Sequence, residues 1–120
     1  MPNLWDALGM LVPMIVSLSV HEWAHARTAL ALGDHTARLL GRCTLDPIAH
    51  IDPIGTLLLP ILGVPFGWAK PVPVDPTRFT RTSSGFGMML TAIAGPLSNV
   101  ALAVLGAATL SVFVRLVPPD

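Results

Sequence analysis

Two long apolar tracts dominate the pattern of hydrophobic and polar positions along the chain. They cover about residues 4–32 and 86–114, and the stretch from Ala7 to Val20 holds no charged residue. Each tract exceeds the roughly 20 residues with which a helix crosses the hydrocarbon core of a bilayer. The pattern therefore predicts two long helices of an all-α membrane protein. Gly33 followed by Asp34 predicts the end of the first helix.

A shorter apolar segment lies between the two tracts. It reads "IGTLLLPILGVPFGWA" (residues 54–69), and prolines and glycines interrupt it. We expect a re-entrant element here, because the segment is too short and too broken for a full span. The preceding part "ARLLGRCTL" has a strand-like pattern, which leaves a short β-hairpin between the long helices open. "KPVPVDP" (residues 70–76) is expected to be extended, since proline removes backbone donors and disfavours helix in the residue before it.

Composition supports one membrane-embedded domain over residues 1–120. Hydrophobic residues make up 52% of the 120 residues and charged residues 12%, which is about half the usual charged share. We therefore expect a polytopic helical bundle. The net charge is zero, so no basic face points to nucleic acid as a partner. Cys43 is the only cysteine, which excludes an intrachain disulfide and a cysteine-type zinc site.

The basic residues predict an orientation. Most of them fall at the end of the first tract or between the two tracts, and a re-entrant middle segment would place them all on one side. The positive-inside rule makes that side the cytoplasm, whereas a full middle span would divide them between both sides. The six residues are Arg27, Arg38, Arg42, Lys70, Arg78 and Arg81.

Two histidines around a carboxylate end the uncharged run. His21 and His25 are four residues apart, so on a helix both imidazoles leave the same face and can bind one metal ion. Glu22 lies about 100° around the helix from His21, beside the ion. This His-Glu-x-x-His spacing is typical of zinc hydrolases, in which the glutamate takes a proton from the zinc-bound water. Ionisable residues beside an apolar run are costly and usually functional, which favours a zinc site over a tolerated helix end.

The third metal ligand is not evident from the sequence. Glu22 is the only glutamate, so a second glutamate cannot serve as it does in thermolysin-type sites. Thr28 and Ala31 stand where a metzincin would have glycine and histidine. The remaining candidates have no convincing context; they are His35, His50, Asp46, Asp52, Asp75 and Asp120, with Asp34 close by at a predicted helix end.

Four motifs together carry a resemblance to a known family. In order along the chain they are "SLSVHEWAHA", "HIDPIGTLLLP", "FGWAKPVPVDP" and "AGPLSN". The chain resembles the site-2 protease family of intramembrane zinc metalloproteases, peptidase family M50, in its compact bacterial form. The resemblance implies a multi-pass enzyme of the bacterial inner membrane that cleaves transmembrane segments of other proteins. It implies Zn²⁺ on His21 and His25, Glu22 as general base, and Asn99 near the site, holding the substrate carbonyl or its oxyanion.

One departure from the family bears on activity. The family's third ligand is an aspartate in a motif on a later membrane helix, and no such motif follows "AGPLSN" here. We therefore expect the chain to be an N-terminal portion of a longer family member, incomplete at its C-terminus. The alternative is a truncated, inactive membrane relative that acts as a binding or assembly partner. The oligomeric state and the substrate are not predicted.

Overall fold

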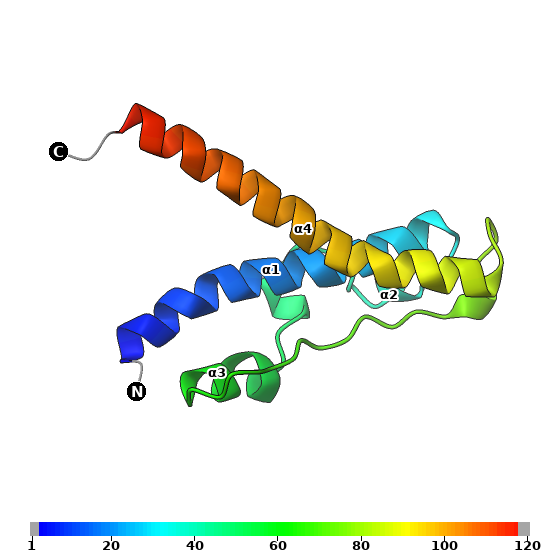
Figure 1. The fold of residues 1–120 in the computed structure, drawn as a ribbon. Coiled ribbons are helices and arrows are strands. Elements are labelled where there is room, and N and C mark those ends of the chain that lie inside the picture. Colours follow the sequence, from blue (N-terminus) through cyan, green and yellow to red (C-terminus); the bar gives the residue numbers. More distant parts are fainter. Residues whose placement is uncertain (1–2, 118–120) are drawn as a thin grey trace.

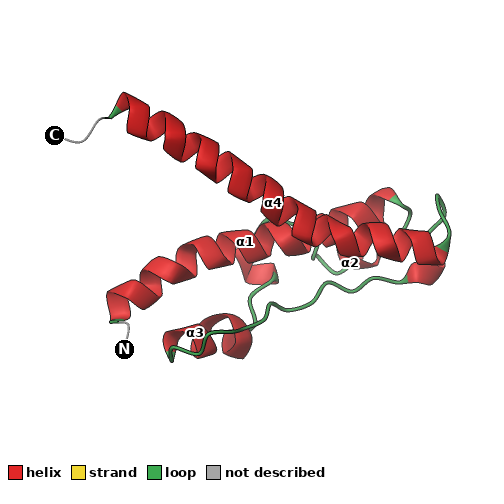
Figure 2. Cartoon of the chain, viewed as in Figure 1, coloured by secondary structure: helices red, strands yellow, loops and turns green. Residues whose placement is uncertain are grey.

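The computed structural model describes residues 3–117, and every regular element among them is a helix (Figure 2). Two long helices, α1 (Leu4–Ala31) and α4 (Ser84–Leu116), make up most of the molecule. Both predicted tracts are thus confirmed as helices. Short elements connect them: α2 (Thr36–Leu39), η1 (Pro47–Ala49), η2 (Pro53–Leu58), α3 (Leu59–Ile61) and η3 (Pro76–Arg78).

Helix α1 begins and ends with clear local signals. At its start the Asn3 side chain accepts from the Asp6 amide, and the Asp6 side chain accepts from the Asn3 amide. This reciprocal capping satisfies two amides that have no partner within the helix. At its end Gly33 takes φ of 111°, which a residue with a side chain rarely adopts. The Leu32 carbonyl there accepts from the amides of Thr80 and Arg81, at 3.1 and 3.2 Å.

The two long helices are antiparallel and diverge. The C-terminal half of α1 packs along the N-terminal half of α4, and the rest of α4 leads away from α1 (Figure 1). Gly95 of α4 is buried at the contact, where it lies against the side chains of His21 and His25, and its lack of a side chain lets α4 approach α1 closely. The second half of α4 leaves large apolar side chains exposed, with Val104 at 63% and Phe113 at 60%. By length and composition, each long helix is able to cross a membrane.

The middle apolar segment forms a hairpin beside the N-terminal half of α1 (Figure 1). It leaves as η2 and α3, turns at Gly63 with φ of 78°, and returns as extended chain. Two hydrogen bonds close the hairpin: Thr56 Oγ1 donates to the Trp68 carbonyl at 2.7 Å, and the Trp68 amide donates to the Gly55 carbonyl at 3.2 Å. The segment is therefore no full-length helix, and its out-and-back path is the shape expected of a re-entrant element.

The short β-hairpin left open by the sequence is absent from residues 3–117. The strand-like segment begins instead as α2, and a turn with φ of 70° at Gly41 follows. A local turn accounts for this difference, because the Asp34 side chain accepts from the Thr36 amide at 3.0 Å and turns the chain just before α2. This local turn outweighs the weak strand pattern.

Asp34 also connects the loops. Its carboxylate is 1% exposed and accepts from the Thr36 hydroxyl at 2.5 Å and from the Asp75 amide at 2.8 Å. Burial by itself would raise the pKa of Asp34, but the hydrogen bonds from Thr36 and Asp75 outweigh it and lower the pKa. The carboxylate thus joins the end of α1 to the segment that leads into α4.

Candidate metal centre

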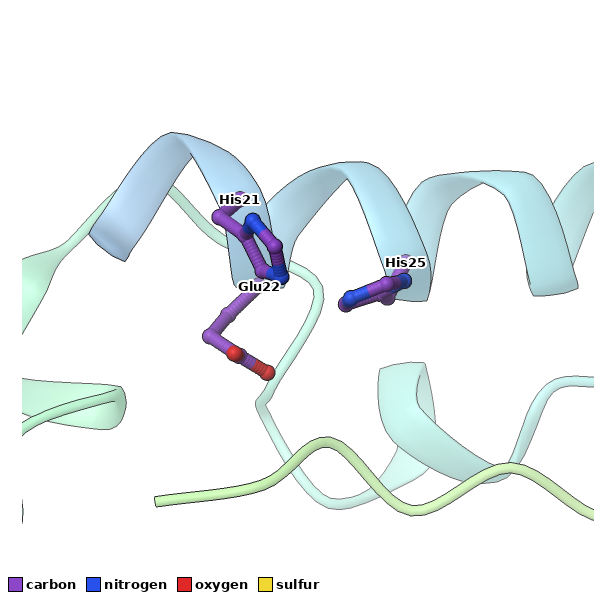
Figure 3. A group of neighbouring side chains, drawn as sticks. All are labelled: His21, Glu22 and His25. Carbon is purple, nitrogen blue, oxygen red and sulfur yellow. The ribbon is translucent and has the colours of Figure 1, made fainter. Parts of the chain in front are cut away.

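His21, Glu22 and His25 project from α1 as a compact group (Figure 3). The two imidazole rings have centroids 4.6 Å apart and planes at 81°. Both histidines are half-buried, and Glu22 is 9% exposed. One potential ligand atom from each of the three residues lies within 4.8 Å of the others. The spacing of four on a regular helix is what brings the rings together.

The Nδ1 atom of His25 has a backbone partner on the opposite helix. It lies 2.6 Å from the carbonyl oxygen of Thr91 on α4. A carbonyl oxygen can only accept, so Nδ1 must carry the proton. The lone pair of His25 therefore lies on Nε2, the nitrogen that remains free to bind a metal ion.

The Nδ1 atom of His21 has a side-chain partner. It lies 2.9 Å from Nδ2 of Asn99, and Oδ1 of the same amide accepts from the Ser17 hydroxyl at 3.2 Å. The structure therefore places Asn99 against His21, on the side of the ring away from Nε2. The role expected of Asn99 toward a substrate oxygen stays a prediction.

Gly95 is the residue of α4 that lies against both rings. A Cβ built at Gly95 would stand 2.4 Å from Nε2 of His25 and 2.6 Å from Nε2 of His21. Any side chain at this position would fill the space that the two Nε2 atoms share. The absence of a side chain at Gly95 therefore leaves room for a group held by both Nε2 atoms.

The carboxylate of Glu22 faces the extended segment that returns from the hairpin. Its Oε2 accepts from the Val72 amide at 3.3 Å. Pro71 and Pro73 flank Val72 and hold this segment extended, as the sequence predicts. In Figure 3 the two carboxylate oxygens of Glu22 are the atoms of its side chain farthest from α1. The backbone contact fixes the carboxylate beside the two imidazoles.

The other candidate ligands do not join this group. His50 is buried with Nε2 2.7 Å from the Thr44 carbonyl, and Asp52 accepts from the amides that begin η2. Asp75 caps η3 and forms an ion pair with Arg78 at 3.2 Å. His35 and Asp46 precede α2 and η1, and Asp120 lies outside the described residues. Within residues 3–117, Glu22 is the carboxylate that lies with the two histidines.

The sequence analysis missed three residues of this site. Ser17, Thr91 and Gly95 act through a hydroxyl, a backbone carbonyl and a missing side chain. Ser17 and Gly95 lie within the quoted motifs "SLSVHEWAHA" and "AGPLSN", but neither was assigned a role there. One signal was nevertheless present: Thr91, Gly95 and Asn99 are four residues apart, so a helix places them on one face.

The donor set suits zinc. Two imidazole nitrogens and a carboxylate are ligand types that Zn²⁺ accepts, and each histidine has an outer partner on Nδ1 that orients its ring. His21 and His25 would hold the ion, with Glu22 beside it. The arrangement can therefore place a metal-bound water against a carboxylate that is ready to take a proton.

Comparison with known proteins agrees with this chemistry. Over 97 residues the chain is 47% identical to "Putative zinc metalloprotease YwhC" of Bacillus subtilis, covering 81% of this chain and 42% of the relative. The chain is similar to bacterial zinc metalloproteases. It is also 36% identical over 91 residues to "Putative zinc metalloprotease Rip2" of Mycobacterium tuberculosis, covering 76% of this chain and 35% of that relative.

A third relative extends the similarity. The chain is 33% identical over 91 residues to the protein of the same name in Mycolicibacterium smegmatis, covering 76% of this chain and 35% of the relative. The chain thus spans less than half the length of these relatives. No family model matches the chain, and no solved structure matches it.

Proposed function

We propose that the protein is a zinc-dependent peptidase of the site-2 protease type, which hydrolyses peptide bonds in the transmembrane segments of other proteins. The observation that carries the proposal is the position of the Glu22 carboxylate, within 4.8 Å of two imidazole nitrogens. The names of the relatives support a zinc metalloprotease. Membership of peptidase family M50 and cleavage within the membrane are the further parts of the proposal.

His21 and His25 would hold the zinc ion through their Nε2 atoms. When bound, the ion lowers the pKa of its water and polarises the substrate carbonyl. Glu22 then takes the proton from the attacking water and passes it to the leaving amide nitrogen. The Val72 amide holds Oε2 in place, so the carboxylate needs no rearrangement before it accepts the proton.

The membrane part of the proposal rests on the apolar helices. Both α1 and α4 have the length and hydropathy of membrane spans, and the histidines lie within α1. We place the protein in the bacterial inner membrane as a multi-pass protein, with a lipid bilayer around the site. A substrate helix must unwind locally to be cleaved, because its carbonyl groups are otherwise hydrogen-bonded within the helix.

An inactive binding or assembly partner is not favoured. Such a protein would have no need for two oriented imidazoles beside a buried carboxylate, and the relatives are named as metalloproteases. The enzyme is therefore the function that the site supports best.

The decisive experiment replaces Glu22→Gln in the protein expressed from its complete gene. Zinc content and cleavage of a model transmembrane substrate are measured for wild type and variant in lipid nanodiscs. We expect the variant to retain zinc, because both histidines remain, and to lose cleavage by a factor of at least about 100, the lower range for a positioned acid–base group.

The matched control is Asp6→Asn, which removes a carboxylate from the exposed first turn of the same helix. This variant should cleave as the wild type does. Wild-type cleavage by Glu22→Gln would remove Glu22 from the mechanism, and a wild type that holds no zinc would refute the proposed function itself.

A further inference from the structure

Two stripes of residues with matching spacing face each other across the helix pair. Ser17, His21 and His25 are four residues apart on α1, and Thr91, Gly95 and Asn99 are four residues apart on α4. Because the helices are antiparallel, Asn99 meets Ser17 and His21, and Thr91 meets His25. Each imidazole thus has one nitrogen held by α4.

The two rings are held by groups of different chemistry. The Thr91 carbonyl only accepts, so it fixes the proton of His25 on Nδ1 in every state. The Asn99 amide offers both a donor and an acceptor, so it permits either tautomer of His21. The proton position on His21 is therefore set by the way the amide faces.

Only one of the two orientations of the amide suits metal binding. Asn99 presents Nδ2 to Nδ1 of His21 at 2.9 Å and therefore donates to it. The proton of neutral His21 must then lie on Nε2, which has no lone pair left for a metal ion. Turning the amide by 180° presents Oδ1, which accepts from a proton on Nδ1 and leaves Nε2 free.

Ser17 permits both orientations of the amide. Its hydroxyl donates to Oδ1 of Asn99 at 3.2 Å. After the turn the same hydroxyl can accept from Nδ2, since a hydroxyl is both donor and acceptor. Ser17 can therefore be a partner of the amide in either orientation.

We propose that Asn99 and Ser17 are positioning residues for the metal centre: in the ion-bound protein Oδ1 of Asn99 accepts from Nδ1 of His21 and so fixes the His21 proton on Nδ1. This inference rests on the proposed function, because it requires the ion. It assigns Asn99 a role that acts through His21. Direct contact of Asn99 with the substrate is not needed for this role.

The test compares Asn99→Asp with Asn99→Leu in the protein expressed from its complete gene. A carboxylate can only accept, so Asn99→Asp holds the His21 proton on Nδ1 and should bind Co²⁺ within about threefold of wild type. Leucine offers no acceptor, and Asn99→Leu should weaken Co²⁺ binding by about 10- to 100-fold, the usual effect of losing an outer partner of a metal-binding histidine. Binding is measured by the visible absorption of the bound Co²⁺ in detergent.

Ser98→Ala is the matched control. The Ser98 hydroxyl donates to the Gly95 carbonyl within α4 at 2.6 Å and touches neither ring. Its removal should leave Co²⁺ binding unchanged. Equal binding by wild type and Asn99→Leu, or equal losses for Asn99→Asp and Asn99→Leu, would overturn the inference.

A second measurement uses the wild type alone and so does not depend on the folding of a variant. Long-range ¹H–¹⁵N spectra of the imidazoles report which ring nitrogen carries the proton. With Zn²⁺ added, the His21 proton should be found on Nδ1. A His21 proton on Nε2 in the zinc-loaded protein would contradict the inference, whereas failure of the wild type to bind Zn²⁺ or Co²⁺ would refute the proposed function and this inference with it.

Discussion

At the scale of single residues, Gly95 sets how closely α4 can approach the imidazoles. Glycine usually weakens a helix interior by roughly 1 kcal/mol relative to alanine. Here the missing side chain leaves open the space between two ring nitrogens, which a Cβ would approach to 2.4 and 2.6 Å. The site therefore requires glycine at a position where the helix by itself would be more stable with alanine.

The variant Gly95→Ala tests whether metal binding requires the missing side chain. We expect the variant to bind Zn²⁺ or Co²⁺ at least about tenfold more weakly, because the new methyl group displaces the rings that bind the ion. Metal affinity is measured by titration, and circular dichroism checks that helix content is kept.

Gly106→Ala is the control on the same helix. A Cβ at Gly106 meets no atom within 4 Å. This variant should bind metal like the wild type and melt at the same or a higher temperature. Unchanged metal binding by Gly95→Ala would show that the close approach is not needed for the site.

At the scale of elements, the connections between helices depend on a few buried polar groups. Asp34 joins the end of α1 to α2 and to Asp75, and the Leu32 carbonyl holds the amides of Thr80 and Arg81. These contacts fix where α4 begins relative to α1. They therefore help to set the register in which Thr91 and Asn99 meet the histidines.

We expect Asp34→Ala to lower the free energy of unfolding by about 2 kcal/mol, because it leaves the amides of Thr36 and Asp75 without their acceptor. The melting temperature in detergent at neutral pH measures the loss. Asp46→Ala is the control, since Asp46 is exposed and caps the three-residue η1; it should have a smaller effect. Equal losses in both variants would contradict a special role for Asp34.

The same carboxylate predicts a pH dependence. Its pKa is lowered in the folded chain, so its stabilisation is complete above the ordinary aspartate value of about 4 and is lost as the pH falls through the folded pKa. The difference in melting temperature between wild type and Asp34→Ala should therefore shrink below about pH 4. A difference that stays constant down to pH 2 would contradict this account.

The sequence predicted these elements unequally. The long helices follow from two long apolar tracts that few polar residues interrupt. The histidine pair follows from a spacing of four within one helix. The hairpin shape followed from Pro60, Gly63 and Pro65. The hairpin left open for the strand-like segment is not found, because the conformation there depends on Asp34, whose buried carboxylate accepts from nearby Thr36 and from distant Asp75.

The spacing of residues does not predict the partners of the histidines, and Asn99 was expected near the site only through the family resemblance. Which residues of α4 face His21 and His25 depends on the register between two helices that are separated by more than 50 residues of chain. That register is set by tertiary contacts, and the spacing within each helix leaves it undetermined. The Thr91 carbonyl has no sequence signal at all, since every residue carries one.

At the scale of the whole molecule, the helix pair is closed at one end and open at the other. The chain that follows α1 and the chain that leads into α4 lie at the closed end, and the start of α1 and the end of α4 lie at the open end (Figure 1). Five of the seven Lys and Arg residues fall in the sequence between α1 and α4. The hairpin of residues 54–69 leads out and back, so its two ends lie close together. This arrangement agrees with one cytoplasmic face for the basic residues, as proposed for a membrane protein.

Cys43 offers a direct test of this orientation, because it is the only cysteine and is partly exposed. A membrane-impermeant maleimide should label it in inverted inner-membrane vesicles and leave it unlabelled in intact spheroplasts. Val117→Cys in a Cys43→Ser background is the control at the open end, and it should show the reverse pattern. Labelling of Cys43 from outside would contradict the proposed orientation.

The equal spacing of Thr91, Gly95 and Asn99 has a mechanical consequence. If α4 slid along α1 by four residues, about 6 Å, each of these residues would take its neighbour's place. Asn99 would then fill the space that Gly95 leaves beside the rings, and Ala103 would face His21 without a polar group. A longitudinal displacement of that size would switch off ion binding while leaving His21, Glu22 and His25 themselves untouched.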